Sequence, residues 1–285
     1  MAVAAVIFDW SGTVVDFGSL APAAAFVEVF REFGVELTIA EARGPMGLAK
    51  RDHIRALGRM PRVNAAWREV HGRALEDPDV ERIHDTFEPL TARVAARYGD
   101  LVPGTAETAA ELRRRGIRIG STTGYTRPIM ESVLPIAERQ AFAPDNLVCA
   151  GDLPAGRPTP LMMYRCFVDL AVWPAAAVVK VDDTAPGIEE ATAAGSWAVG
   201  VAMSGNAVGL SPEELAGLDP DATARLRERA SAELRAAGAH YIIDTVADLL
   251  PVVDAIDAQL AAGNTPFVLQ GALQSGRTAA RSNFP

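Results

Sequence analysis

The sequence is poor in cysteine, in basic charge and in long apolar runs, and each shortage excludes a class of protein. The 285 residues include two cysteines, Cys149 and Cys166, with neither a CxxC spacing nor the density of a disulfide scaffold. We therefore expect a reducing, cytoplasmic environment. No run approaches the roughly 18 apolar residues of a membrane span. The short apolar N-terminus also lacks the basic segment of a signal peptide.

Charge narrows the possible ligands further. The formal net charge is −9 and the sequence pI is about 5.0. Such a balance argues against the phosphate electrostatics of nucleic-acid binding. Any anion that this protein binds must therefore be held by a local positive site or by a metal ion. Hydrophobic residues make up 49% of the chain, which is enough for a sizeable core.

Short apolar strands alternate with helical segments over most of the chain. Residues 2–8 form a fully apolar strand of the kind found at the centre of a parallel sheet. Further strands are expected at 117–122, 147–150, 177–181, 197–201 and 241–244. Since helical segments separate these strands, the pattern predicts an α/β fold with a doubly wound, Rossmann-like parallel sheet.

One long segment departs from this alternation. From about residue 21 to 97 the pattern is helical throughout, with no strand signal. A block of this length between two strand regions predicts an inserted, all-helical domain. We expect an α/β core at 1–18 and 99–262, a helical domain at 19–98, and a C-terminal tail at 263–285.

The first strand ends in a carboxylate. Asp9 is the first polar residue after it, and Gly12 and Thr13 follow in the turn. Ligands of open α/β sheets bind beyond the carboxyl ends of the strands, where backbone amides can hold phosphate oxygens. A carboxylate there can attack phosphorus if a cation such as Mg²⁺ separates the two anions. Taken alone, these residues fit an ordinary acid at a strand end equally well.

Three further polar sites follow later segments in order. Thr123 comes near the end of the second strand, Arg157 lies in a later loop, and Asp182 and Asp183 end another strand. Each has a common structural alternative: a turn residue, a solvated charge and a helix cap. Four such sites in order favour a phosphoryl-transfer centre over coincidence.

This order resembles the haloacid dehalogenase superfamily of aspartate-nucleophile phosphotransferases, from residue 2 to about 200. The resemblance implies Asp9 as nucleophile, and Thr123 and Arg157 as ligands of the transferring phosphoryl group. It implies a Mg²⁺ site formed by Asp9, Asp183 and the backbone carbonyl of Ser11. The helical insert stands where the superfamily carries its first cap domain.

Position 11 departs from the ordinary phosphatases of that superfamily. They carry there a second Asp, which protonates the leaving oxygen, and a serine hydroxyl cannot do this near pH 7. Ser11 therefore counts against the alternative function, a Mg²⁺-dependent phosphate-ester phosphatase or phosphomutase. A non-catalytic binding protein of the same fold is disfavoured because Asp9 and Asp183 are both present.

The helical insert holds a candidate for the missing chemistry. Lys50 and His53 are three residues apart and share one helix face. The cationic neighbour Arg51, His53 and burial under a closed cap would lower the pKa of Lys50 toward the neutral amine that forms Schiff bases. A solvated basic helix face is the alternative interpretation.

Several runs, 6–13, 45–50, 120–126 and 154–158, resemble the phosphonoacetaldehyde hydrolase (phosphonatase) family. The resemblance implies hydrolysis of the P–C bond of phosphonoacetaldehyde to acetaldehyde and phosphate. It implies a Lys50 Schiff base and an Asp9 aspartyl phosphate, with Mg²⁺ as cofactor. The implied assembly is a homodimer, and the implied partner is a small phosphonate, with no nucleic acid and no membrane.

The remaining candidate residues complete this expected site. His53 would move protons during imine formation, and the substrate would contact a further set of residues: Gly12, Thr13, Met46, Gly124 and Tyr125. Two positions depart from the family. Its last motif often reads Gly-Asp with another Asp four residues on, whereas this chain has Asp182-Asp183 and then Gly187. Ser19 replaces a cysteine found in some members.

Overall fold

A computed structural model describes residues 1–45 and 50–266 of the chain. It forms two compact units. The first, which we call the α/β unit, contains Met1–Ser19, Asp100–Arg127 and the described chain from Ala137 onward. The second, the helical unit, contains Leu20–Gly99 and Pro128–Ile136. The predicted tail lies outside the described residues from 267 onward.

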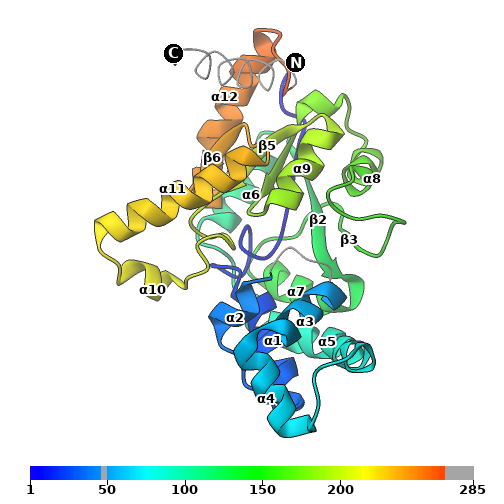
Figure 1. Ribbon diagram of the computed structural model, residues 1–285. Coiled ribbons are helices and arrows are strands. Elements are labelled where there is room, and N and C mark those ends of the chain that lie inside the picture. The colour runs from blue at the N-terminus through cyan, green and yellow to red at the C-terminus, as the bar shows by residue number, and fades with distance from the viewer. Residues whose placement is uncertain (46–49, 267–285) are drawn as a thin grey trace, which may run out of the picture. The chain divides into compact units, whose positions relative to one another are not determined.

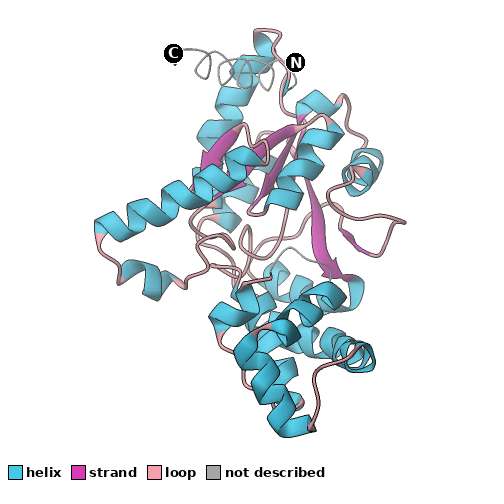
Figure 2. Ribbon diagram, viewed as in Figure 1, coloured by secondary structure: helices cyan, strands magenta, loops and turns pink. Residues whose placement is uncertain are grey.

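The α/β unit is built on a six-stranded sheet with the order β3-β2-β1-β4-β5-β6, and every neighbouring pair is parallel. Figure 2 shows the strands and the helices that surround them. The strand bounds are β1 Ala5–Phe8, β2 Arg118–Thr126, β3 Val148–Ala150, β4 Val178–Asp182, β5 Trp197–Val201 and β6 Tyr241–Ile243. The predicted fold class, a doubly wound parallel sheet, is confirmed.

Burial explains why these segments are strands. Every residue of β1, β4 and β5 is buried, as expected of central strands covered on both faces. β2 continues to Thr126, past the predicted end at residue 122. Its pairing with β3 shifts register between Thr123 and Thr126, so this end of the strand is irregular, as at many functional sites.

Helices cover both faces of the sheet. α8, α9 and α11 pack together against β2, β4 and β5, while α6 packs against β2 and contacts α12 (Figure 1). The helix bounds of this unit are α6 Thr105–Arg114, α8 Leu161–Asp169, α9 Ala185–Ala194, α10 Pro212–Ala216, α11 Pro220–Ala236 and α12 Leu249–Ala261, with 3₁₀ turns at Ala175–Ala177 and Val246–Asp248. α7, Arg127–Arg139, contributes its central part to the helical unit.

The long helix α11 has no counterpart in the sequence interpretation. It buries Ala230, Ser231 and Leu234 among many charged residues, so its apolar stripe is too thin to stand out as a helical period. Asp219 caps its N-terminus by accepting a hydrogen bond from the Ala222 N–H. The cap, more than the hydrophobic pattern, marks where this helix begins.

The described residues of the helical unit contain no strand, as expected. Its helices are α1 Leu20–Glu32, α2 Ile39–Arg43, α3 Lys50–Arg59, α4 Pro61–His71 and α5 Asp77–Arg97. Aromatic side chains fill its interior, where Phe26 packs against Phe87 and Phe30 against Trp67. Among all described helices, none has both the length and the apolar character that a bilayer crossing requires.

The register of the sheet brings the predicted polar residues together. Phe8, the last residue of β1, lies opposite Ser121 on β2 and Val181 on β4. Asp9, Thr122 and Asp182 are the next residues on three adjacent strands. Since parallel strands present their carboxyl ends at one edge, these side chains converge there.

Candidate active site

Asp9 is a buried carboxylate at the convergence point. Its backbone N–H donates to Val181 at 2.9 Å, which continues the β1–β4 ladder. Its Oδ1 lies 2.8 Å from Nη2 of Arg157. Burial, then the charge of Asp182, raises the pKa of Asp9 to about 6, against the opposing effects of Arg157 and Lys180. A further cation beside Asp9 would favour its ionised, nucleophilic form.

Three carboxylates at this edge are arranged as ligands for a metal ion. Asp9, Asp182 and Asp183 each offer an oxygen within 4.8 Å of the others. Oδ2 of Asp183 accepts the Asn206 N–H at 2.7 Å, and the buried Oδ1 has no hydrogen-bond partner in the described part of the chain. Burial, then the charges of Asp9 and Asp182, raises the pKa of Asp183 well above its usual value. An oxygen-rich, cation-deficient site of this kind fits a divalent metal ion.

Asp182 is bonded differently from its neighbour. Its Oδ1 accepts from the Thr184 N–H at 3.0 Å and the Thr184 hydroxyl at 2.7 Å. Its Oδ2 lies 3.2 Å from Arg157 Nη1 and 3.1 Å from Lys180 Nζ. Burial opposes ionisation, but these two cations outweigh it and hold the pKa of Asp182 below its usual value. The charge of Asp182 is therefore already balanced by protein groups.

The packing of Asp182 also accounts for Gly187. A Cβ at position 187 would lie 2.0 Å from Cγ and Oδ2 of Asp182. The Asp182 carboxylate thus fills the space that any side chain at 187 would need. The acid at 182 and the glycine at 187 are therefore coupled by packing.

Gly12 leaves room for Asp183. It has a φ of +85°, and a Cβ there would lie 2.3 Å from Asp183 Oδ2. Thr13 beside it is fully buried, and its hydroxyl has no hydrogen-bond partner among the described residues. Ser11 donates to Oδ2 of the buried Asp16 at 2.5 Å, and the hydroxyls of Ser11 and Ser19 are 3.0 Å apart.

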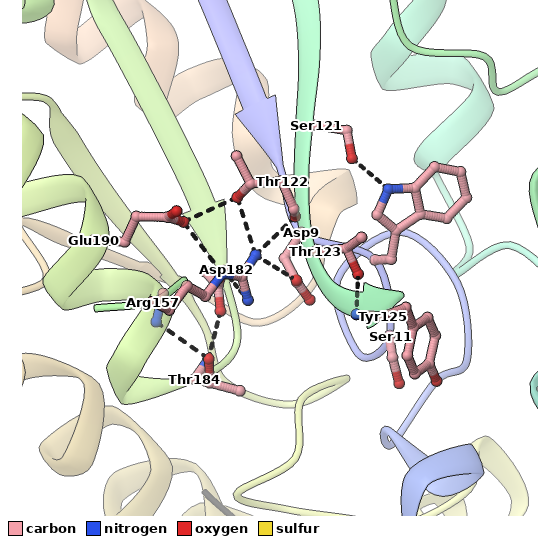
Figure 3. Close-up of polar contacts among 12 residues, drawn as sticks. Asp9, Ser11, Ser121, Thr122, Thr123, Tyr125, Arg157, Asp182, Thr184 and Glu190 are labelled. Atoms are coloured by element: carbon pink, nitrogen blue, oxygen red, sulfur yellow. Dashed lines mark hydrogen bonds and ion pairs between the residues drawn. The ribbon is translucent and has the colours of Figure 1, made fainter. Parts of the chain in front are cut away.

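The end of β2 lies on the other side of Asp9 (Figure 3). Thr123 is buried, and its hydroxyl accepts the backbone N–H of Tyr125 at 3.1 Å. Burial, then the charge of Asp16, raises the pKa of Tyr125 well above its usual value, so the phenol stays protonated. The intervening Gly124 is exposed, with open space where a Cβ would stand.

Arg157 lies in a buried network that sequence reasoning found only in part. Its guanidinium bonds Asp9, Asp182 and Glu190, and its Nη2 also donates to the backbone oxygen of Thr122 at 2.7 Å. Lys180 and Glu190, both fully buried, were not predicted as site residues. A lysine inside the otherwise apolar segment 178–181 was the available signal, since an unpaired buried lysine is rare.

The two predicted residues of the helical unit lie against one aromatic ring. Lys50 is exposed as a residue, yet its Nζ lies 5.4 Å from the ring centroid of Phe26 and 5.2 Å from that of Phe87. Burial of the amine lowers the pKa of Lys50 to about 8. The predicted contribution of Arg51 is absent, because Arg51 is paired with Glu81 at 3.0 Å.

His53 is buried and stacks on the same Phe26 ring, at a centroid distance of 3.7 Å. Its Nε2 lies 2.9 Å from the carbonyl oxygen of Ala42, so Nε2 carries the proton. Burial lowers the pKa of His53 to about 4, which keeps the ring neutral near pH 7. Met46, predicted to contact substrate, lies outside the described residues.

Comparisons with known proteins show which proteins this chain resembles. The family model for haloacid dehalogenase-like hydrolases matches residues 3–195. A phosphonoacetaldehyde hydrolase of Paraburkholderia phytofirmans is 54% identical over 93% of this chain and 99% of its own length. That of Bordetella pertussis is 47% identical over 92% of this chain and 95% of its own. The crystal structure of a phosphonoacetaldehyde hydrolase-like protein from Oleispira antarctica superposes with a TM-score of 0.85 at 43% identity, covering 93% of this chain and 96% of that one.

The contact between Gly12 and Asp183 makes a first prediction. Gly12→Ala will weaken binding of a divalent ion by at least about 10-fold, because the new methyl group forces Asp183 aside and strains a positive φ. Titration calorimetry with Mg²⁺ measures the loss. Gly156→Ala is the matched control, since a Cβ at 156 meets nothing within 4 Å. Equal affinities in the two variants would show that Asp183 is not a ligand.

Proposed function

This chain belongs to the haloacid dehalogenase-like hydrolases and, among them, to the phosphonoacetaldehyde hydrolase family, and from that premise we propose that it hydrolyses phosphonoacetaldehyde to acetaldehyde and phosphate. The observation that carries the proposal is the amine of Lys50, which lies over the rings of Phe26 and Phe87 and whose pKa is lowered by burial to about 8. An amine of this kind suits imine chemistry with an aldehyde. An ordinary phosphate-ester hydrolase has no use for it.

The phosphorus half of the reaction belongs to the α/β unit. In our proposal Asp9 attacks phosphorus in line, while Arg157 and Thr123 bind the oxygens of the phosphoryl group. The turn residues Gly12 and Thr13 present backbone amides to the same group. Water then hydrolyses the aspartyl phosphate and releases phosphate.

Mg²⁺ is the metal that we propose for this site, with Asp9, Asp183 and the Ser11 carbonyl as protein ligands. The bound ion would neutralise the repulsion between the Asp9 carboxylate and the dianionic substrate. The differing partners of Asp182 and Asp183 support a division of labour. Asp183 has an oxygen free for the metal, while Asp182 serves as counter-charge to Arg157 and Lys180.

The carbon half of the reaction uses Lys50. Its neutral amine adds to the aldehyde and loses water to form an imine, which is then protonated. When Asp9 attacks, the electron pair of the P–C bond moves into the protonated imine and yields an enamine. The enamine takes a proton on carbon, and hydrolysis of the resulting imine releases acetaldehyde and Lys50. Because no alkoxide leaves, no acid is needed at position 11, consistent with Ser11.

Other groups complete the proposal. His53, with its pKa of about 4, would accept and return a proton during imine formation. Met46, Gly124 and Tyr125 would contact the bound substrate. Lys50 belongs to the helical unit and Asp9 to the α/β unit, so the reaction uses one group from each.

The organisation that we propose follows the family resemblance. The helical domain, residues 19–98, acts as a cap on the core, residues 1–18 and 99–262, and the enzyme works as a homodimer in the cytoplasm. The two cysteines are buried, and neither forms a disulfide among the described residues, which is consistent with a reducing compartment.

The activity itself is tested with two substrates. We expect acetaldehyde release from phosphonoacetaldehyde, abolished by EDTA and restored by Mg²⁺, and little hydrolysis of p-nitrophenyl phosphate. A coupled alcohol dehydrogenase assay measures acetaldehyde directly. Efficient cleavage of the phosphate ester without acetaldehyde release would instead identify an ordinary phosphatase.

The imine has its own test, because the chain contains two lysines, Lys50 and Lys180. Borohydride added with phosphonoacetaldehyde should reduce the imine and add mass to the peptide that contains Lys50. The fully buried Lys180 should stay unlabelled. Lys50→Arg keeps the positive charge but cannot form the imine, so it should lose labelling and more than about 10³-fold in kcat. Labelling of Lys180 alone would refute the mechanism.

The pH dependence of trapping gives a second readout. With a pKa of about 8, below the usual 10.5, roughly a tenth of the amine is neutral at pH 7. The initial labelling rate should therefore rise with pH through about pH 8 and level off roughly one pH unit higher. A rate that keeps rising beyond pH 10 would show an unperturbed lysine.

Asp9→Asn tests the nucleophile. The amide should abolish phosphoenzyme formation and lower kcat by more than about 10³-fold, because an amide nitrogen or oxygen is a poor nucleophile toward phosphorus. Mass spectrometry of acid-quenched enzyme detects the aspartyl phosphate. Asp85→Asn, at an exposed position of α5, is the control. Retained turnover in Asp9→Asn would remove Asp9 from this role.

A further inference from the structure

Glu190, on α9, is a buried carboxylate for which the proposed reaction has no direct use. Its side chain has no exposed surface. Oε2 accepts from the Thr122 hydroxyl at 2.9 Å and from Nε of Arg157 at 3.2 Å, and it lies 3.8 Å from Nζ of Lys180. Figure 3 shows Glu190 on the far side of Arg157 from Asp9. Glu190 therefore acts on Asp9 only through other side chains.

Burial of such a group is costly, and a carboxylate is kept in the interior only when cations and hydrogen bonds offset the lost hydration. The adjacent Glu189 is exposed, so a glutamate on α9 need not be buried for the helix to form. The partners of Glu190 are the two buried cations of the site, Arg157 and Lys180. This points to a role in arranging those cations.

The two cations share one carboxylate oxygen. Arg157 Nη1 lies 3.2 Å and Lys180 Nζ 3.1 Å from the same Oδ2 of Asp182. Both also donate to the hydroxyl of Thr122, at 3.0 and 2.8 Å, and that hydroxyl gives its own proton to Glu190. Glu190 thus fixes the direction of the Thr122 hydroxyl and adds a second anion beside the two cations.

We infer that Glu190 is a positioning residue that holds the guanidinium of Arg157 by its Nε edge, and that Thr122 and Lys180 complete the clamp. Held at Nε, at Nη1 and by the Thr122 carbonyl, the guanidinium keeps Nη2 directed at Asp9, where the phosphoryl group is transferred. This inference rests on the proposed function, because it assigns Arg157 to the transferring group.

Glu190→Gln removes the charge and keeps the shape. We expect kcat to fall roughly 10- to 100-fold, as for loss of one charge-assisted hydrogen bond in the transition state. KM should not rise, because removing a nearby anion does not weaken binding of a dianionic substrate. Glu189→Gln, one residue away and exposed, is the control and should match wild type in both constants. A Glu190→Gln enzyme with wild-type kcat overturns the inference.

A double variant separates positioning from simple loss of fold. In Glu190→Gln with Lys180→Met, both charges of the Glu190–Lys180 pair are removed, so the loss in kcat should be smaller than the product of the two single losses. Losses that multiply would show that the two residues do not form one network. If Glu190→Gln does not fold, Thr122→Val removes the shared hydroxyl and must give the same lowered kcat with unraised KM.

Orthovanadate binding makes the test independent of the substrate. Vanadate with Mg²⁺ mimics five-coordinate phosphorus, and titration calorimetry should show roughly 10- to 100-fold weaker binding to Glu190→Gln than to Glu189→Gln. Equal vanadate affinity overturns the positioning role. If wild type releases no acetaldehyde while vanadate binding still depends on Glu190, the proposed substrate is wrong and the clamp stands.

Discussion

The α/β unit is organised around charges that are buried together. Asp9, Asp182, Asp183 and Glu190 face two cations, Arg157 and Lys180, in the described part of the chain. Each ion alone would be costly to bury, and together they offset one another. The carboxylates outnumber the cations, so the cluster has an unmet need for positive charge. The proposed metal site would meet this need.

The register of the parallel sheet fixes the positions of several of these charged side chains. Because Phe8 is in register with Ser121 and Val181, the next residues of three strands share one edge. Close approach there leaves no room for side chains at two positions. Gly12 lies against Asp183 and Gly187 against Asp182, so a side chain at either position would displace a carboxylate. The same packing arrangement pairs Asp182 with two cations and leaves one oxygen of Asp183 without a hydrogen-bond partner among the described residues.

The helical unit changes the pKa of its candidate catalytic group by a different physical means. Its amine lies over aromatic rings and not within an ion-pair network, and burial lowers the pKa of Lys50. The adjacent arginine plays no part, since it is paired on the helix surface with Glu81. In the mechanism that we propose, the protonated imine of Lys50 accepts the electron pair from carbon and the Asp9 carboxylate takes phosphorus.

Sequence alone determined the fold class, the helical insert and the candidates Asp9, Thr123, Arg157 and Asp183, because strand period and polar residues at strand ends are local signals. It missed α11, whose apolar stripe is thin, and it overlooked Glu190, which looks like any other helix glutamate beside Glu189. Only the tertiary structure decided which of these two glutamates is buried, which of Asp182 and Asp183 is already paired, and why Gly187 is a glycine. Those answers depend on distances between segments far apart in the chain, and no local pattern carries them.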